Sequence, residues 1–198
     1  MIPLPTGQFD VILADPPWKF ASNSRAKPGR NARRHYPVMR LDDIAALPVR
    51  SLRATDCALF LWITGPMLVI GAHIPVMQAW GFRPSAIAFT WVKLNPKAPG
   101  LFTVARDYHM GGGFTTRANA EYCLLGVRGR SLRVSKSVRE LIVAPRRQHS
   151  RKPDEFYERV QQYVGRGYVP ERRIVELFAR QQRLGIVPWG DEMEKFDG

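Results

Sequence analysis

The chain has 198 residues, of which 45% are hydrophobic, and its 30 Lys and Arg against 17 Asp and Glu give a net charge of +13. This length, without a Pro/Gly/Ser-rich linker, predicts one domain over residues 1–198 with a sizeable core. The charge favours a polyanionic partner, nucleic acid first. A basic protein with no such partner is the alternative, because net charge informs association and not fold.

Several classes of protein are excluded by what the sequence lacks. Cys57 and Cys123 both lie in apolar runs and are expected to be buried, reduced thiols. No Cys/His cluster has the spacing of a zinc site, so no metal is predicted. The N-terminus has no signal-peptide pattern, and the apolar run 57–73 is interrupted by Gly65-Pro66. We therefore expect a cytoplasmic protein without a membrane segment.

The pattern of apolar runs predicts an α/β domain. Strands are expected at residues 10–14, 58–63, 85–92, 121–127, 140–143, 173–178 and 186–189. Continuous apolar runs are typical of strands covered on both faces, as in a largely parallel sheet. Helices are expected at 41–47, at 66–80 with Gly81 ending it, and at 153–164 with Pro153 in the first helical position. This alternation is that of a doubly wound fold.

Two long irregular segments, 21–36 and 95–117, each follow a predicted strand end. Loops of this length in a compact domain are usually functional or disordered. The first carries five basic residues that we expect to contact phosphates, and solvated mobile loops are the alternative. These five are Arg25, Lys27, Arg30, Arg33 and Arg34.

The tetrapeptide Asp15-Pro16-Pro17-Trp18 directly follows the first predicted strand. Ligands of open α/β sheets bind at such strand ends. A carboxylate and a proline carbonyl are acceptors suited to an exocyclic amino group, and the Trp18 indole could stack on a planar base. Alone, the motif is equally consistent with a turn and a core aromatic.

A second set of polar residues lies towards the C-terminus. Lys152 precedes a predicted helix and could hold the carboxylate of an amino-acid-plus-nucleoside cofactor. Glu176 or Asp191 could accept hydrogen bonds from its ribose hydroxyls. Each residue also has a purely structural interpretation, and the glycine-rich dinucleotide fingerprint is absent.

Eight ordered blocks over roughly residues 9–193 resemble the mRNA-adenosine N6-methyltransferase catalytic-subunit family, with its bacterial and phage branch nearest. The blocks are Asp15-Pro16-Pro17-Trp18, Tyr36-Pro37-Val38-Met39, Leu59-Phe60-Leu61-Trp62, Trp91-Val92-Lys93, Thr116-Arg117-Ala118-Asn119-Ala120-Glu121, His149-Ser150-Arg151-Lys152-Pro153-Asp154-Glu155, Glu176-Leu177-Phe178-Ala179-Arg180 and Trp189-Gly190-Asp191-Glu192.

The resemblance implies a Rossmann-like, S-adenosylmethionine-dependent methyltransferase fold in permuted order, with the catalytic motif first and the cofactor strand late. It implies catalytic roles for Asp15, Pro16, Pro17 and Trp18, and active-site loops at about 19–40 and 94–117. The cofactor contacts implied are Asp15, Ser150, Lys152, Glu176, Phe178, Arg180 and Asp191, the last of which is often an amide in relatives. The base-pocket and nucleic-acid contacts implied are Tyr36, Trp62, Trp91, Lys93, Arg117 and Asn119.

The expected reaction is methylation of the adenine N6 amine in nucleic acid, DNA in preference to RNA, by direct in-line transfer. Cytosine N4 methylation uses similar chemistry, but its enzymes usually place Ser where this chain has Asp15. A protein-glutamine methyltransferase would have Asn there, and the charge of +13 argues against it. A catalytically silent nucleic-acid-binding subunit is the alternative from another class. The recognition sequence and the oligomeric state cannot be read from the sequence.

Overall fold

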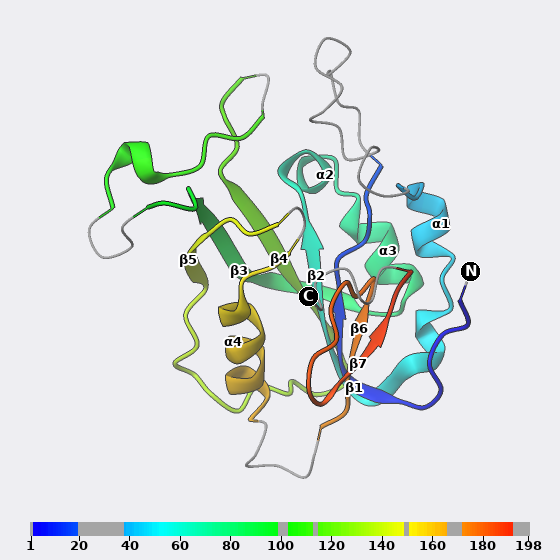
Figure 1. The fold of residues 1–198 in the computed structure, drawn as a ribbon. Helices are drawn as coiled ribbons and strands as arrows, with labels where there is room; N and C mark the ends of the chain where they lie inside the picture. Colours follow the sequence, from blue (N-terminus) through cyan, green and yellow to red (C-terminus); the bar gives the residue numbers. More distant parts are fainter. Residues whose placement is uncertain are drawn as a thin grey trace.

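One mixed sheet runs through the computed structural model, which describes residues 2–19, 38–98, 103–112, 115–148, 151–165 and 172–191. Its seven strands lie in the order β5-β3-β4-β2-β1-β6-β7 (Figure 1). The strands are β1 Phe9–Ala14, β2 Arg53–Ile63, β3 Arg83–Leu94, β4 Ala120–Arg128, β5 Leu141–Pro145, β6 Ile174–Leu177 and β7 Ile186–Trp189. All seven predicted strands are confirmed, with β2 and β3 longer than expected.

The sheet is parallel except at β4, which pairs antiparallel with both β2 and β3. The central strand β1 pairs in parallel with β2 and β6. Because β4 runs in the opposite direction, its amino end lies at the same edge as the carboxyl ends of the other strands. That edge therefore collects residues from the beginning of β4 and from the ends of β1, β3 and β6.

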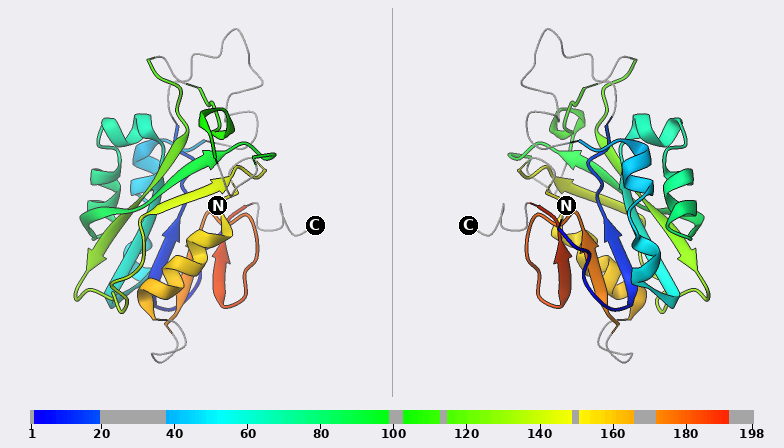
Figure 2. Two further views of the ribbon diagram at one scale, coloured as in Figure 1. Left: turned by 90° about the vertical axis from the view of Figure 1, so that its left-hand side faces the viewer. Right: turned by 90° about the vertical axis from the view of Figure 1, so that its right-hand side faces the viewer.

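Helices cover both faces of the sheet (Figure 2). Helices α1 (Leu41–Ala45), α2 (Gly65–Val69) and α3 (His73–Ala79) lie on one face, and α4 (Asp154–Val164) lies on the other. Alternate residues of β1 enter the two cores, Ile12 towards the α1–α3 side and Leu13 towards the α4 side. Burial on both faces explains why β1 is a continuous apolar run.

The helix expected at 66–80 is two helices, which corrects the prediction. The backbone turns at Gly71, whose φ of 71° lies in the left-handed region that glycine adopts without strain. Gly81, at φ 74°, follows the end of α3 as expected. Pro153 is the N-cap of α4 and not its first helical residue.

Cys57 and Cys123 are free and buried, as predicted, and burial raises the pKa of both thiols. Within the described ranges, no helix has the length and apolar content needed to cross a membrane. Nor does that part of the chain hold a group of three or more His, Cys, Asp or Glu side chains that could bind a metal ion.

Candidate active site

Four side chains of alternating charge lie in a row at the carboxyl edge of the sheet. Asp15 follows β1, Lys152 precedes α4, Glu121 lies near the start of β4 and Lys93 near the end of β3. The Lys152 Nζ is 3.1 Å from Asp15 Oδ2 and donates to Glu121 Oε2 at 2.8 Å. Lys93 Nζ donates to the other oxygen of Glu121. We call Asp15, Lys152, Glu121 and Lys93 the charged row.

Removal from water makes the charges of Lys152 and Glu121 depend on their neighbours in the charged row. The Lys152 side chain is only 8% exposed. Burial alone would lower the pKa of its ammonium, but Asp15 and Glu121 outweigh it and the pKa is raised. Burial likewise opposes ionisation of Glu121, yet Lys152 and Lys93 hold its pKa at about 2. Lys152 therefore stays charged because of Asp15 and Glu121, and Glu121 stays charged because of Lys152 and Lys93. The ion pair with Lys152 in turn holds the Asp15 carboxylate in position.

The backbone of the Asp-Pro-Pro-Trp motif forms a tight turn that is attached to the following segment. The Trp18 amide donates to the Pro16 carbonyl at 2.8 Å, and the Met39 amide donates to the Pro17 carbonyl at 2.9 Å. A carbonyl oxygen has two lone pairs, so Pro16 can accept a second hydrogen bond. Asp15 and Pro16 are thus consecutive residues of a loop that two prolines and two backbone hydrogen bonds stiffen.

Trp18 does not form the exposed stacking surface that the sequence suggested. The indole is buried among the residues packed under α1–α3, and its Nε1 donates to the Trp62 carbonyl at 2.9 Å. The structure therefore supports the alternative interpretation of Trp18 as a core aromatic. Its contribution is to tie the end of β1 to the end of β2.

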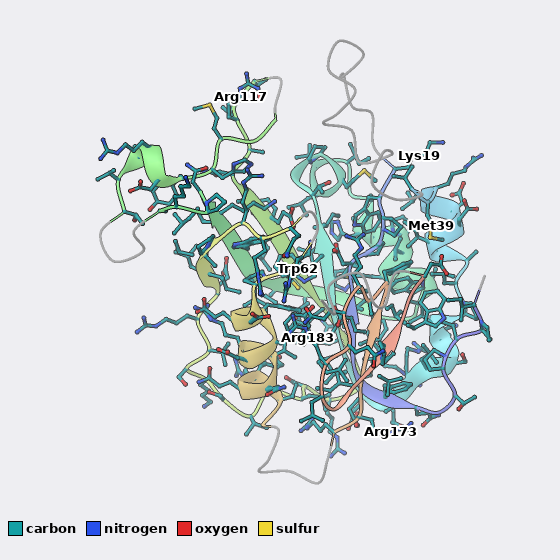
Figure 3. The ribbon with its side chains drawn as sticks, in the orientation of Figure 1. Lys19, Met39, Trp62, Arg117, Arg173 and Arg183 are labelled. Carbon is teal, nitrogen blue, oxygen red and sulfur yellow. The ribbon has the colours of Figure 1, made fainter. Side chains whose placement is uncertain are left out.

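The two other predicted base-pocket tryptophans are also buried, on the α4 side of the sheet. The Lys152 ammonium lies over the Trp62 ring at 4.8 Å from its centroid, and Lys93 lies over Trp91 at 4.9 Å. Figure 3 shows Trp62 near the middle of the molecule, below Arg117. In this structure the two rings support the lysines of the charged row.

A second polar group lies at the end of β6. Glu176 is partly buried, and this removal from water raises the pKa of its carboxyl to about 7 even though the Tyr157 hydroxyl donates to it at 2.7 Å. Arg183 lies over the Tyr157 ring, 3.8 Å from its centroid, and donates to Asp154 at 2.9 Å. We call Glu176, Tyr157, Arg183 and Asp154 the β6 cluster.

Phe178, directly after β6, is the only described non-glycine residue with a positive φ, at 63°. This conformation is uncommon for a bulky residue and persists where its surroundings fix it. Here the Phe178 ring packs edge-on against Trp189 at 5.6 Å, and the Ala179 amide donates to the Trp189 carbonyl at 2.9 Å. Such strain tends to occur at functional sites, in agreement with the predicted cofactor-binding position.

The donors and acceptors at this edge fit an amino-acid-plus-nucleoside cofactor. An ammonium has three N–H donors. Lys152 directs one at Asp15 and one at Glu121, so the third remains for the carboxylate of the cofactor. Glu176 accepts from Tyr157 through one oxygen, which leaves the other for a ribose hydroxyl. Asp191 is exposed after β7, next to the strand that carries Glu176. Arg180 is partly buried two residues beyond Phe178.

The remaining predicted residues are distributed as follows. Arg117 is exposed, and Asn119 accepts the Lys93 amide through its backbone carbonyl at 2.8 Å. Seven predicted residues lie outside the described part of the chain: Arg25, Lys27, Arg30, Arg33, Arg34, Tyr36 and Ser150. The first basic segment, 21–36, is therefore outside it as a whole.

Sequence reasoning did not select Glu121, Tyr157 or Arg183 as site residues. Glu121 was noted only as the acidic first residue of a predicted strand and as the last residue of the block that begins at Thr116, without a role of its own. The signal that could have found it is the antiparallel direction of β4, which places Glu121 opposite Trp91 in register. Tyr157 lies on α4, four residues after Pro153, on the face that packs against the sheet.

Known proteins that are similar to this chain are methyltransferases. A family model described as MT-A70 matches residues 9–192. The type II methyltransferase M.MunI of a Mycoplasma species is 28% identical over 207 residues, covering 96% of this chain and 80% of that protein. A probable N(6)-adenosine-methyltransferase MT-A70-like protein of rice is 33% identical over 175 residues, covering 88% of this chain. The human N(6)-adenosine-methyltransferase catalytic subunit METTL3 is 29% identical over 179 residues, covering 90% of it.

The chain spans only about a fifth of the rice protein (21%) and about a quarter of the human one (27%). The match therefore concerns the region of those longer proteins that corresponds to residues 9–192 here.

Proposed function

We propose, from the premise that this chain belongs to the MT-A70 family, that it methylates the N6 amine of adenine in nucleic acid, DNA in preference to RNA. The relatives are named methyltransferases, and methyltransferases of this family take the methyl group from S-adenosylmethionine. Similarity to a type II methyltransferase along almost the whole chain supports DNA. The net charge of +13 suits either polyanion.

The observation that carries the proposal is the fixed pair of acceptors at the end of β1. An adenine amine is a weak nucleophile because its lone pair is conjugated with the ring. The Asp15 carboxylate and the Pro16 carbonyl would accept its two hydrogens and direct the lone pair away from them. The Lys152 ammonium, 3.1 Å from Asp15 Oδ2, holds the carboxylate in place. Much of the rate enhancement would come from this orientation.

Lys152, Glu176 and Asp191 are the residues that would hold the cofactor. Lys152 would bind its carboxylate, and the two acids would bind its ribose hydroxyls. When bound, S-adenosylmethionine supplies an electrophilic methyl group on a sulfonium. The amine would attack this group in line, without a covalent enzyme intermediate, and Asp15 is placed to take the proton that the methylated nitrogen releases.

The direct test supplies labelled S-adenosylmethionine with a mixed pool of DNA and RNA and digests the products to nucleosides. Label in N6-methyldeoxyadenosine is the expected result. Label in N6-methyladenosine would replace DNA by RNA, and label in N4-methyldeoxycytidine would contradict the choice of base. Nucleic-acid binding without any methyl transfer would contradict the proposed reaction and favour the catalytically silent subunit.

A further inference from the structure

The connection between β3 and β4 forms an arm that stands out from the carboxyl edge of the sheet (Figure 1). We define the arm as its described residues, 95–98, 103–112 and 115–119. It is joined to the sheet by backbone hydrogen bonds: the His109 amide donates to the Lys93 carbonyl at 2.8 Å, and the Asn95 amide donates to the Asp107 carbonyl at 2.8 Å. The arm is thus anchored at the residues that flank the charged row.

The arm is also paired with itself near Met110. The Gly111 amide donates to the Ala118 carbonyl at 3.0 Å, and the Ala118 amide donates to the Gly112 carbonyl at 3.1 Å. A Cβ on Gly111 would collide with the Ala118 carbonyl oxygen, so only glycine permits this close approach. The backbone on both sides of Met110 is therefore held by hydrogen bonds and not free.

Met110 nevertheless presents 74% of its surface to solvent, and Val104 presents 51%. The arm also carries cations, since Lys97, Arg106 and Arg117 are all exposed. An exposed apolar side chain on an arm that also carries cations resembles the side chains that nucleic-acid-binding proteins insert into a duplex. Methionine is among the side chains that act as wedges between base steps, while neighbouring cations contact phosphates.

A chain of contacts leads from the residue next to Met110 to Asp15. The amide of His109, the residue before Met110, donates a hydrogen bond to the Lys93 carbonyl. The Lys93 side chain donates to Glu121, which also accepts from Lys152, the ion-pair partner of Asp15. An adenine held at Asp15 must leave its stack if the substrate is a duplex, and this costs a few kcal/mol. A wedge that fills the gap left behind would lower that cost.

We propose that Met110 is a wedge that enters the duplex as the target adenine is flipped towards Asp15. This inference rests on the proposed function and assigns Met110 a role in duplex substrates only. Single-stranded nucleic acid has no stack of paired bases to open, so Met110 should matter little there. The ratio of methylation on duplex and denatured forms of one DNA is thus the quantity that reports on the wedge.

The experiment measures incorporation of labelled methyl groups into plasmid DNA, native and heat-denatured, by wild type, Met110→Ala and Met110→Leu. We expect Met110→Ala to lower the native-to-denatured ratio about tenfold, a change equal to about 1.4 kcal/mol. Met110→Leu should retain most of the ratio, because leucine is also found as a wedge. Val104→Ala, which removes an exposed apolar side chain elsewhere on the arm, is the matched control and should leave the ratio unchanged.

Three results would overturn the wedge. Met110→Ala could lower both rates equally, Val104→Ala could act as strongly as Met110→Ala, or the wild type could methylate denatured DNA or RNA alone. The first two results, and methylation of denatured DNA alone, leave methyl transfer to DNA and the proposed function intact. Methylation of RNA alone would overturn the wedge and would also replace DNA by RNA in the proposed function. A wild type that methylates no nucleic acid would instead contradict the proposed function itself.

Discussion

The charged row and the β6 cluster lie at the same edge of the sheet, and each contains a partly buried glutamate. The pKa values of these two carboxyl groups are shifted in opposite directions. Glu121 has two lysines as neighbours, and its pKa falls to about 2. Glu176 accepts a hydrogen bond from a neutral phenol, that of Tyr157, while Arg183 donates its hydrogen bond to Asp154. Removal from water then raises the pKa of Glu176 to about 7. Burial alone therefore does not set the charge of a carboxyl group. Its nearest partner decides whether it stays ionised.

This difference suits the two tasks proposed for the site. The charged row must keep Asp15 in a fixed position and Lys152 charged. The β6 cluster needs only oxygen atoms that accept hydrogen bonds, which a protonated or an ionised carboxyl can provide. Each prediction below changes one member of these groups.

Asp15→Ala should have the largest effect, a loss of methyl transfer to background. In the proposed mechanism the carboxylate acts on the amine mainly in the transition state, so S-adenosylmethionine affinity should stay within a few fold of the wild type. Asp15→Asn should be nearly as inactive, because an amide is a weaker acceptor and can present a donor. Single-turnover assays with calorimetric titration of the cofactor would test this. Wild-type turnover in either variant would contradict the mechanism.

Lys152→Ala should raise the dissociation constant for S-adenosylmethionine about tenfold or more, since it removes a charge-assisted hydrogen bond. It also leaves Asp15 without its ammonium partner and Glu121 with Lys93 alone. Removing one member of a buried ion pair costs about 3–5 kcal/mol of stability. Calorimetry and chemical denaturation would measure the two effects. An unchanged dissociation constant in a folded variant would place the cofactor elsewhere.

The pH dependence of stability should differ in sign between the two acids. The folded pKa of Glu121, about 2, lies below its ordinary 4.5, so its contribution is present above pH 4.5 and is lost as the pH falls towards 2. The folded pKa of Glu176, about 7, lies above 4.5, so the free energy of unfolding should fall as the pH rises from 4.5 to 7. Each difference corresponds to about 3 kcal/mol.

Urea denaturation from pH 3 to pH 8 would measure both effects. Glu121→Gln should remove the loss of stability on the acid side, and Glu176→Gln should flatten the decline between pH 4.5 and 7. Each variant is the control for the other, because it leaves the other acid and its partners in place. Identical profiles for the two variants would refute the comparison.

Tyr157→Phe should have the smallest effect. It removes the hydroxyl that donates to Glu176 at 2.7 Å and keeps the ring under Arg183. Loss of one hydrogen bond costs about 1 kcal/mol. Because that bond opposes the effect of burial, the pKa of Glu176 should rise further. Carboxyl titration by NMR would detect this, and a pKa that falls or stays constant would show that the phenol does not influence the acid.

Much of this architecture could be predicted from the sequence, for a definite reason. Strands buried on both faces are continuous apolar runs, so β1 and β2 stand out without an alignment, and the end of β1 locates Asp15. The break between α2 and α3 at Gly71 was harder to predict, because an isolated glycine within an apolar run is compatible with a continuous helix. Glu121 was missed because its role depends on the direction and register of β4. The burial of Trp18 depends on packing between strands that are far apart in sequence.

The antiparallel β4 has a consequence for how this molecule could diversify. Its direction makes the arm a hairpin connection whose two ends, near Lys93 and Glu121, are clamped by the sheet. Residues between them can be lengthened, shortened or exchanged without displacing either anchor. Target preference could therefore change by replacement of one continuous stretch of gene, while the machinery beneath it is inherited intact.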